Sequence, residues 1–389
     1  MNTMEQGIVT LLRSAITGEK LALPVDFRLE EAMELIRQHG MPTLVYQGAV
    51  NCGLDRQDPA MQRLFQSYIR TMLAGEAQMK ECERIFAAFD QQGIDYMPLK
   101  GCRMKALYPK QELRVMGDAD ILIRLDQYER IVPIMEQLGF TFKYESDHEL
   151  VWDNKRLHLE LHKRVIASFN EDFYAYFGDG WRLALTANGT RYSMKAEDEF
   201  VYLFTHFARH FRDGGIGCRH VVDLWVFLRS HPGLDLAAAR RELDRIYLGE
   251  FLDHVVALIR WWFEDGEAFD RTEVIHAFLF NSGSQGERAN LTRSAMIKRM
   301  KHALPIKNQK LAYIWSGVFP TWNALKREYP VLEKMPLLAP FVWCHRLCSR
   351  LLAPREEWAK RAKQLDMIGD NSMTAHQELL NYVGLDYHF

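Results

Sequence analysis

The chain has 389 residues, of which 48% are hydrophobic and 26% are charged, and these ordinary proportions exclude disordered and fibrous proteins. The formal net charge is −2 and like charges form no long block, so the chain carries no strong general nucleic-acid signature. The first residues lack a secretory signal and no apolar run reaches the about 18 residues that cross a bilayer, so we expect a cytoplasmic protein without a membrane segment.

The hydrophobic pattern changes twice along the chain. Up to about residue 90, apolar residues recur at three- and four-residue steps, which is typical of amphipathic helices. From Gly93 onward, short β-compatible runs alternate with helical segments. Strands are predicted over residues 94–99, 118–123, 140–144, 149–152 and 156–162, and helices over 101–107 and 127–138. Beyond about residue 172 the helical period returns and persists almost to the end.

This order of elements predicts an α/β (α+β) fold, in which a small mixed sheet is flanked by helices. The predicted organisation is an N-terminal helical region (1–90), an α/β core (91–170), a helical domain (171–280) and a mostly helical C-terminal extension (281–389).

Three carboxylates could meet on one face of this sheet. Asp118 and Asp120 lie two residues apart in a predicted strand, so their side chains point to the same side. Such like charges repel each other unless a divalent cation binds between them. In residues 156–162 the leucines form one face and Glu160 lies on the other, so Glu160 becomes a third oxygen ligand if the two strands pair. The plain alternative is a surface turn, where Asp-x-Asp is also common.

Residues around the aspartates could bind phosphate. Lys100 and Gly101 fall at a strand-to-helix junction, where free backbone N–H groups and the helix dipole favour an anion. Arg114 precedes the aspartates by a short loop and could pair with phosphate oxygens. Gly117 allows a ligand to approach the backbone closely.

Residues 99–140 resemble the uncharacterised nucleotidyltransferase family of the DNA polymerase β-like superfamily. The shared pattern is Leu-Lys-Gly, then Arg-x-x-Gly-Asp-x-Asp, then Leu-Gly, and the segment here reads LKGCRMKALYPKQELRVMGDADILIRLDQYERIVPIMEQLGF. The resemblance continues through a Glu-Leu-His strand, a helical His-x-x-x-His element and an Arg-x-x-x-Asp element. These are represented by Glu160 and His162, by His206 and His210, and by Arg219 and Asp223.

The resemblance implies a sheet of the polymerase β-like type, with a helical domain closing over the nucleotide. It also implies that Asp118, Asp120 and Glu160 bind Mg²⁺ or Mn²⁺. This chain departs from the superfamily at the helix after the first strand, where Lys100-Gly101-Cys102 stands in place of a Gly-Ser pair that holds the triphosphate.

The candidate site residues in the predicted helices each have two interpretations. His206 and His210 lie one helical turn apart and either line the cleft or are ordinary surface or core histidines. Arg219 either binds phosphate or forms an ion pair with Asp223, four residues further on.

We therefore predict a metal-dependent nucleotidyltransferase. It would transfer a nucleoside monophosphate from a nucleoside triphosphate such as ATP to an acceptor hydroxyl and release pyrophosphate. The acceptor could be a small molecule, a tRNA or a protein. One alternative is a non-catalytic nucleotide- or partner-binding module on the same fold, and another is a toxin-like modifier of tRNA or protein.

Overall fold

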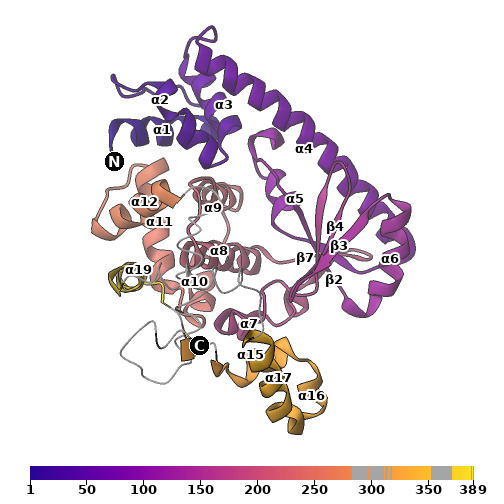
Figure 1. Ribbon diagram of the computed structural model, residues 1–389. Helices are drawn as coiled ribbons and strands as arrows, with labels where there is room; N and C mark the ends of the chain where they lie inside the picture. Colours follow the sequence, from indigo (N-terminus) through magenta and orange to yellow (C-terminus); the bar gives the residue numbers. More distant parts are fainter. Residues whose placement is uncertain are drawn as a thin grey trace.

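The computed structural model describes residues 1–282, 318–351, 370–386 and 388, together with residues 294, 297, 311, 314 and 315 (Figure 1). The chain begins with four helices: α1 (Thr3–Thr17), α2 (Leu29–Gln38), α3 (Pro42–Cys52) and α4 (Pro59–Gln92). The long helix α4 begins where the Asp58 side chain accepts hydrogen bonds from two backbone N–H groups, with Pro59 in the first turn. It ends at Gly93, whose φ of 60° favours glycine.

A mixed sheet of seven strands follows, in the order β3-β4-β5-β2-β1-β7-β6. Strand β2 is parallel to β5 and β1 is parallel to β7, whereas the other neighbouring pairs are antiparallel. The strands are β1 (Tyr96–Pro98), β2 (Ala119–Ile123), β3 (Thr141–Glu145), β4 (Glu149–Asp153), β5 (His158–His162), β6 (Leu185–Asn188) and β7 (Arg191–Ser193).

The two faces of the sheet belong to different hydrophobic cores. On one face, Ile121 and Leu159 pack with the C-terminal half of α4 and with α6 (Tyr128–Gln137). On the other face, Leu122 belongs to a larger core shared with the N-terminal helices and with α8 (Ala196–Asp213). In Figure 1, α4 and α6 lie on one side of the sheet and α8 lies on the other. Polar residues on the α8 side of β2 and β5 therefore face the interior between sheet and helices.

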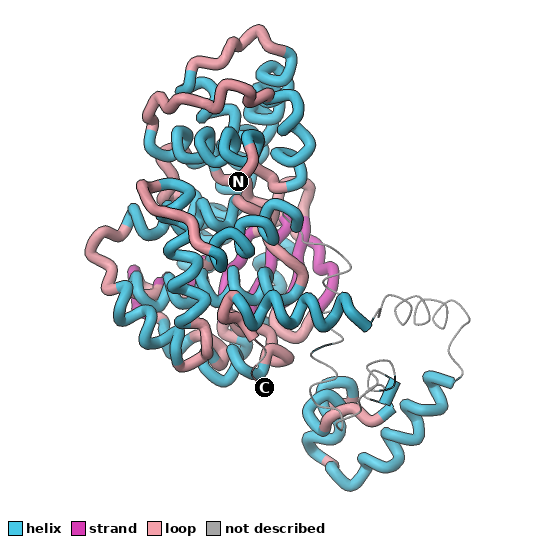
Figure 2. Tube along the Cα trace, turned by 90° about the vertical axis from the view of Figure 1, so that its left-hand side faces the viewer, coloured by secondary structure: helices cyan, strands magenta, loops and turns pink. Residues whose placement is uncertain are grey.

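Helices make up the rest of the described chain. Two short helices lie between strands, α5 (Lys100–Lys105) and α7 (Glu171–Phe177). Helix α8 is followed by α9 (Arg219–Ser230), α10 (Leu236–Asp244), α11 (Gly249–Phe263) and α12 (Asp270–Ser282). Four helices follow further along, α15 (Trp322–Glu328), α16 (Val331–Lys334), α17 (Ala339–Leu351) and α19 (Asp370–Tyr382). Figure 2 shows a helical cluster standing apart from the main body, which corresponds to α15, α16 and α17. Among the described helices, none combines the length and the apolar character that crossing a membrane requires.

The predicted fold class is confirmed, and the five predicted strands are present with small shifts of their ends. Strand β2 begins at Ala119, so Asp118 lies directly before the strand and not within it. The expectation of continuous helix beyond residue 172 is wrong for residues 185–193, which form a β-hairpin that pairs with β1. The predicted boundary at residue 281 falls at the end of α12, and residues 283–293 beyond it lie outside the described part of the chain.

Candidate active site

The predicted carboxylates converge because β2 and β5 are neighbouring parallel strands. Asp120 is paired in register with Glu160, and both side chains line the same cavity. Asp118, just before β2, lines it too, whereas Ala119 and Ile121 point into the core on the other side of the sheet. The strand register therefore confirms the pairing from which Glu160 was inferred.

Asp120 is the most deeply buried of these carboxylates, with 2% of its surface exposed. Its Oδ1 atom lies 3.0 Å from the Lys100 Nζ and 2.9 Å from the His162 Nε2. Burial alone would raise the pKa of Asp120, but the charge of Lys100 and the hydrogen bond from His162 hold it well below its usual value. Asp120 is thus ionised and already carries two cationic neighbours.

His162 joins two of the carboxylates. Its Nε2 atom lies 3.4 Å from the Glu160 Oε2 in addition to its contact with Asp120. Burial lowers the pKa of His162, but the hydrogen bonds to Asp120 and Glu160 outweigh it and raise this pKa to about 9. The imidazole is therefore protonated at neutral pH and holds both carboxylates in place.

Asp118 experiences the opposite balance. Burial raises its pKa, and the negative charge of Asp120 raises it further, although Lys100 opposes this effect. The repulsion among these carboxylates is the kind of unfavourable charge that a divalent cation removes. Ligand atoms of Asp120, Glu160 and His162 all lie within 4.8 Å of one another, whereas Asp118 belongs to no such group among the described residues. The oxygens of Asp120 and Glu160 are therefore close enough to share a hard cation.

All twelve residues selected from the sequence line one cavity of about 430 Å³. They are Lys100, Gly101, Arg114, Gly117, Asp118, Asp120, Glu160, His162, His206, His210, Arg219 and Asp223. The cavity also contains four polar residues that the sequence reasoning missed, namely His148, Glu149, Arg209 and His220. Glu149 is paired in register with His162 across β4 and β5, and Arg209 lies three residues after His206 on α8, so strand register and helix period were the available signals.

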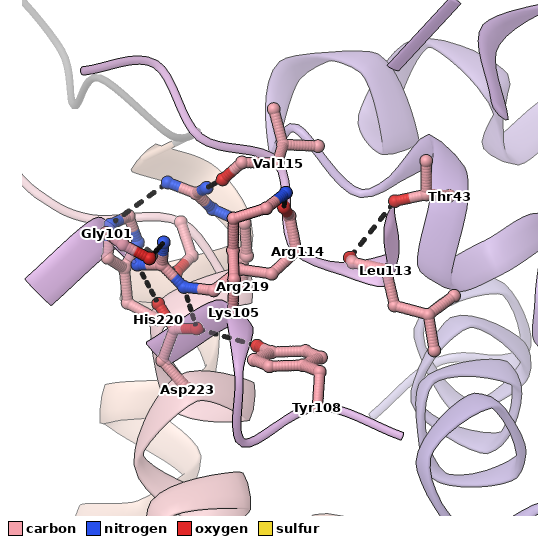
Figure 3. Close-up of polar contacts among 11 residues, drawn as sticks. Thr43, Gly101, Lys105, Tyr108, Leu113, Arg114, Val115, Arg219, His220 and Asp223 are labelled. Carbon is pink, nitrogen blue, oxygen red and sulfur yellow. Dashed lines mark hydrogen bonds and ion pairs between the residues drawn. The ribbon is translucent and has the colours of Figure 1, made fainter. Parts of the chain in front are cut away.

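Arg114 lines the cavity but is already paired with a carboxylate, so its contact with phosphate stays a prediction. Its guanidinium forms a two-bond ion pair with Asp223 of α9, at 2.8 Å and 3.2 Å, and the Tyr108 hydroxyl donates to the same carboxylate at 2.6 Å (Figure 3). The Arg114 Nη1 also donates to the backbone oxygen of Gly101 at 3.3 Å. No local pattern predicts this partner, and through it Arg114 joins the loop before Asp118 to the helical domain.

Asp223 is consequently not the ion-pair partner of Arg219 that helical spacing suggested. The Arg219 Nη1 donates to the backbone oxygen of Val115, and its Nη2 lies 3.5 Å from the His220 Nε2 (Figure 3). Of the two readings for Arg219, the intrahelical pair is wrong because Arg114 takes up the carboxylate, and a phosphate contact stays a prediction.

His206 and His210 lie in the cavity wall and not on the outer surface. Their ring centroids are 4.4 Å apart, as expected one turn apart on α8. Burial lowers the pKa of both imidazoles well below the usual value, and the positive charges of Lys100 and Arg209 act in the same direction. Both are therefore neutral polar groups at physiological pH.

The residues of the Lys100-Gly101-Cys102 segment face two different sides of α5. Lys100 and Gly101 face the cavity, and a Cβ at Gly101 would lie 3.0 Å from the backbone oxygen of Asp118, so glycine allows this close approach. Cys102 lies on the core side instead, with its Sγ 3.5 Å from the Sγ of Cys82 on α4. Cys102 therefore does not stand in for a ligand-binding serine.

We expect Cys102→Ser to leave nucleotide affinity unchanged and to lower the free energy of unfolding by about 1–3 kcal/mol, because it buries a hydroxyl beside a thiol. Titration calorimetry with a nucleoside triphosphate and urea denaturation would measure the two quantities. A gain in nucleotide affinity would contradict the assignment of Cys102 to the core. Cys344→Ser, at an exposed thiol, is the matched control.

Acidic side chains on adjacent strands face a cavity whose helical side carries cationic groups, an arrangement that can bind a divalent cation together with a phosphate-bearing ligand. The family model for uncharacterised nucleotidyltransferases matches residues 26–264, and the chain belongs to this family. The match contains every residue of the cavity. Comparisons with curated proteins and with solved structures found no match. Membership of the family supports nucleotidyl transfer as the general activity and a nucleotide as a substrate.

Proposed function

We propose that the protein transfers a nucleoside monophosphate from a nucleoside triphosphate, with ATP as the first candidate, to an acceptor hydroxyl. The observation that carries this proposal is the pairing of Asp120 with Glu160 across β2 and β5, with Asp118 beside them, in a cavity that also contains cationic groups. The acceptor is a small molecule, a tRNA or a protein.

The donor set fits Mg²⁺ or Mn²⁺. Asp118, Asp120 and Glu160 offer only carboxylate oxygens, which hard cations prefer, and the raised pKa of Asp118 reflects its burial and the like charge beside it. A bound divalent cation would supply charge neutralisation at the phosphates and would lower the pKa of the acceptor hydroxyl.

The residues of the chain then have distinct roles. The acceptor oxygen attacks the α-phosphorus, the bond from this phosphorus to the bridging oxygen of the β-phosphate breaks, and pyrophosphate leaves. Burial raises the pKa of Glu160, but the interaction with His162 outweighs this effect, so the carboxylate stays ionised. Glu160 therefore accepts the hydroxyl proton. Protonated His162 orients Asp120 and Glu160, and Lys100 offsets negative charge near the phosphates.

Transfer can be tested with α-³²P-labelled nucleoside triphosphates, each incubated with the protein and a cell lysate with and without Mg²⁺. We expect label in a macromolecule or small molecule that depends on both the protein and the metal. Digestion with RNase or protease then distinguishes a tRNA acceptor from a protein acceptor.

The absence of labelling with every nucleotide would contradict the proposal. A thermal shift with ATP that does not need Mg²⁺ and persists in the Asp118→Ala, Asp120→Ala double variant would instead favour a non-catalytic nucleotide-binding module.

A further inference from the structure

Besides the protonated His162, which is paired with Asp120 and Glu160, the cavity contains one lysine and three arginine side chains. Two of these four already have a carboxylate partner. The Lys100 Nζ lies 3.0 Å from the Asp120 Oδ1, and the Arg114 guanidinium donates two hydrogen bonds to the Asp223 carboxylate. The positive charge of each is therefore compensated within the protein.

The other two, Arg209 of α8 and Arg219 of α9, have no carboxylate within ion-pair distance among the described residues. Arg209 Nη2 lies 2.8 Å from the His210 Nε2, and Arg219 contacts the Val115 carbonyl and the His220 ring. The Nε atoms of both arginines are buried and have no hydrogen-bond partner within the described part of the chain. Buried donors without a partner are costly, and a ligand that accepts from these Nε atoms would remove that cost.

The histidines beside these arginines are neutral, so they do not balance the positive charge of the arginines. An arginine can only donate, so the Nε2 atom of His210 accepts the bond from Arg209 and carries no proton. The Nδ1 atom of His220 lies 3.3 Å from the Gly217 carbonyl and serves as donor there, which leaves its Nε2 to face Arg219. Burial lowers the pKa of His220 to about 3, and the charge of Arg219 acts in the same direction. The α8–α9 side of the cavity therefore carries two positive charges without an ion-pair partner among the described residues, and Asp223 acts on Arg219 only from beyond ion-pair distance.

The opposite side consists of the strands with Asp120, Glu160 and Glu149. An anionic group entering the cavity is repelled from that side and attracted to α8 and α9. Guanidinium groups are suited to phosphate because their planar donors match two phosphate oxygens at once.

We propose that Arg209 and Arg219 form an anion subsite that binds a phosphate group of a substrate. The source of this group is either the polyphosphate tail of the nucleoside triphosphate or a phosphate on the acceptor. The choice between these sources rests on the proposed function, but the existence of the subsite does not.

The subsite can be tested by titration calorimetry with inorganic pyrophosphate in the absence of divalent metal. We expect Arg209→Gln and Arg219→Gln each to weaken binding by about 10- to 100-fold, the loss that follows from removing a hydrogen bond between charged groups. Arg229→Gln is the matched control, because Arg229 lies on α9 but packs over Trp225 outside the cavity. It should bind pyrophosphate like the wild type.

Thermal unfolding gives a second readout that does not depend on a ligand. Because neither arginine has a carboxylate of the described residues within ion-pair distance, Arg209→Gln and Arg219→Gln should keep or raise the melting temperature, as residues held for binding and not for stability do. Pyrophosphate that does not bind the wild type, or that binds the double variant as tightly as the wild type, would overturn the proposal. A lower melting temperature in both single variants would also overturn it, since it would assign the arginines a structural role.

Competition identifies the source of the phosphate. If the subsite holds the triphosphate tail, pyrophosphate and a non-hydrolysable ATP analogue displace each other. If it holds an acceptor phosphate, the two bind together and Arg209→Gln leaves the affinity for the analogue unchanged. Both results support the subsite. Neither measurement requires turnover, so the test of the subsite is independent of whether the protein catalyses the proposed transfer reaction.

Discussion

Replacing Asp120 with asparagine is expected to lower the rate of nucleotidyl transfer on the order of 10²- to 10³-fold, the loss typical of removing one charge-stabilising group from a preorganised site. It should also destabilise the fold by about 3–5 kcal/mol, because it leaves the buried Lys100 and His162 cations without their shared carboxylate. Single-turnover kinetics and urea denaturation without metal measure the two effects.

The matched substitution is Asp118→Asn, which removes a carboxylate of the same cavity. The loss of transfer should be similar, but the free energy of unfolding should stay unchanged or rise, because the raised pKa of Asp118 shows that its burial and the charge of Asp120 disfavour the ionised form. A large drop in stability for Asp118→Asn, or full activity in either variant, would show that these aspartates do not act as proposed.

The convergence of the carboxylates could be predicted because it depends on local periodicity. A strand period of two places Asp120 and Glu160 on the face opposite Ile121 and Leu159, and only the pairing of the two strands had to be assumed. The parallel register between β2 and β5 then brings the side chains together. The helix period places His206 and His210 on one wall for the same reason.

The partners of Arg114 could not be predicted, because Asp223 follows it by more than a hundred residues and approaches only when α9 packs beside the loop. Helical spacing pointed to Arg219 as the nearer partner of that carboxylate, and a local rule cannot rank a local partner against a distant one. Arg209 could not be singled out from the sequence, because the proposal for it depends on having no carboxylate partner among the described residues, which is a property of the assembled cavity.

The hairpin of β6 and β7 did leave a signal in the sequence. Asn188 is followed by Gly189, a dipeptide that favours tight hairpin turns. In the structure Asn188 pairs with Arg191, so Gly189 and Thr190 connect the two strands, and Gly189 has a φ of 57°. The residues on both sides of the hairpin have a helical period, and helix was therefore predicted throughout this region. The hairpin extends the sheet beyond β1, away from the carboxylates, so this error did not affect the predicted site.

Replacing Asp223 with alanine is expected to lower the free energy of unfolding by about 3–5 kcal/mol, because it leaves the Arg114 guanidinium buried without a counter-ion. The Tyr108 hydroxyl loses its acceptor in the same variant. Since Arg114 joins the loop before Asp118 to α9, the variant should also bind nucleotide more weakly. Urea denaturation measures the stability, and Asp253→Ala is the control.

Asp253 forms a two-bond ion pair with Arg240 at 2.9 Å and 2.8 Å, but the two side chains are 40% and 52% exposed. Its loss should cost less than about 1 kcal/mol, because solvent screens the pair. Equal effects of Asp223→Ala and Asp253→Ala would show that burial of the Arg114 pair contributes nothing. In a double variant with Arg114→Ala, the total loss should be smaller than the sum of the single losses, since no unpaired charge is left.

The pH dependence of the free energy of unfolding tests whether Asp223 and Arg114 form an ion pair. Burial would raise the pKa of Asp223, but Arg114 and Arg219 hold it below its usual value. A carboxylate with a lowered pKa in the folded state stabilises the fold fully above the unfolded-state pKa of about 3.9 and loses that contribution as the pH falls through the lowered pKa. The stability difference between wild type and Asp223→Ala should therefore be constant near neutral pH and shrink under acid. A difference that grows on acidification would mean that the pair is not an ion pair, and that another contact joins the loop before Asp118 to α9.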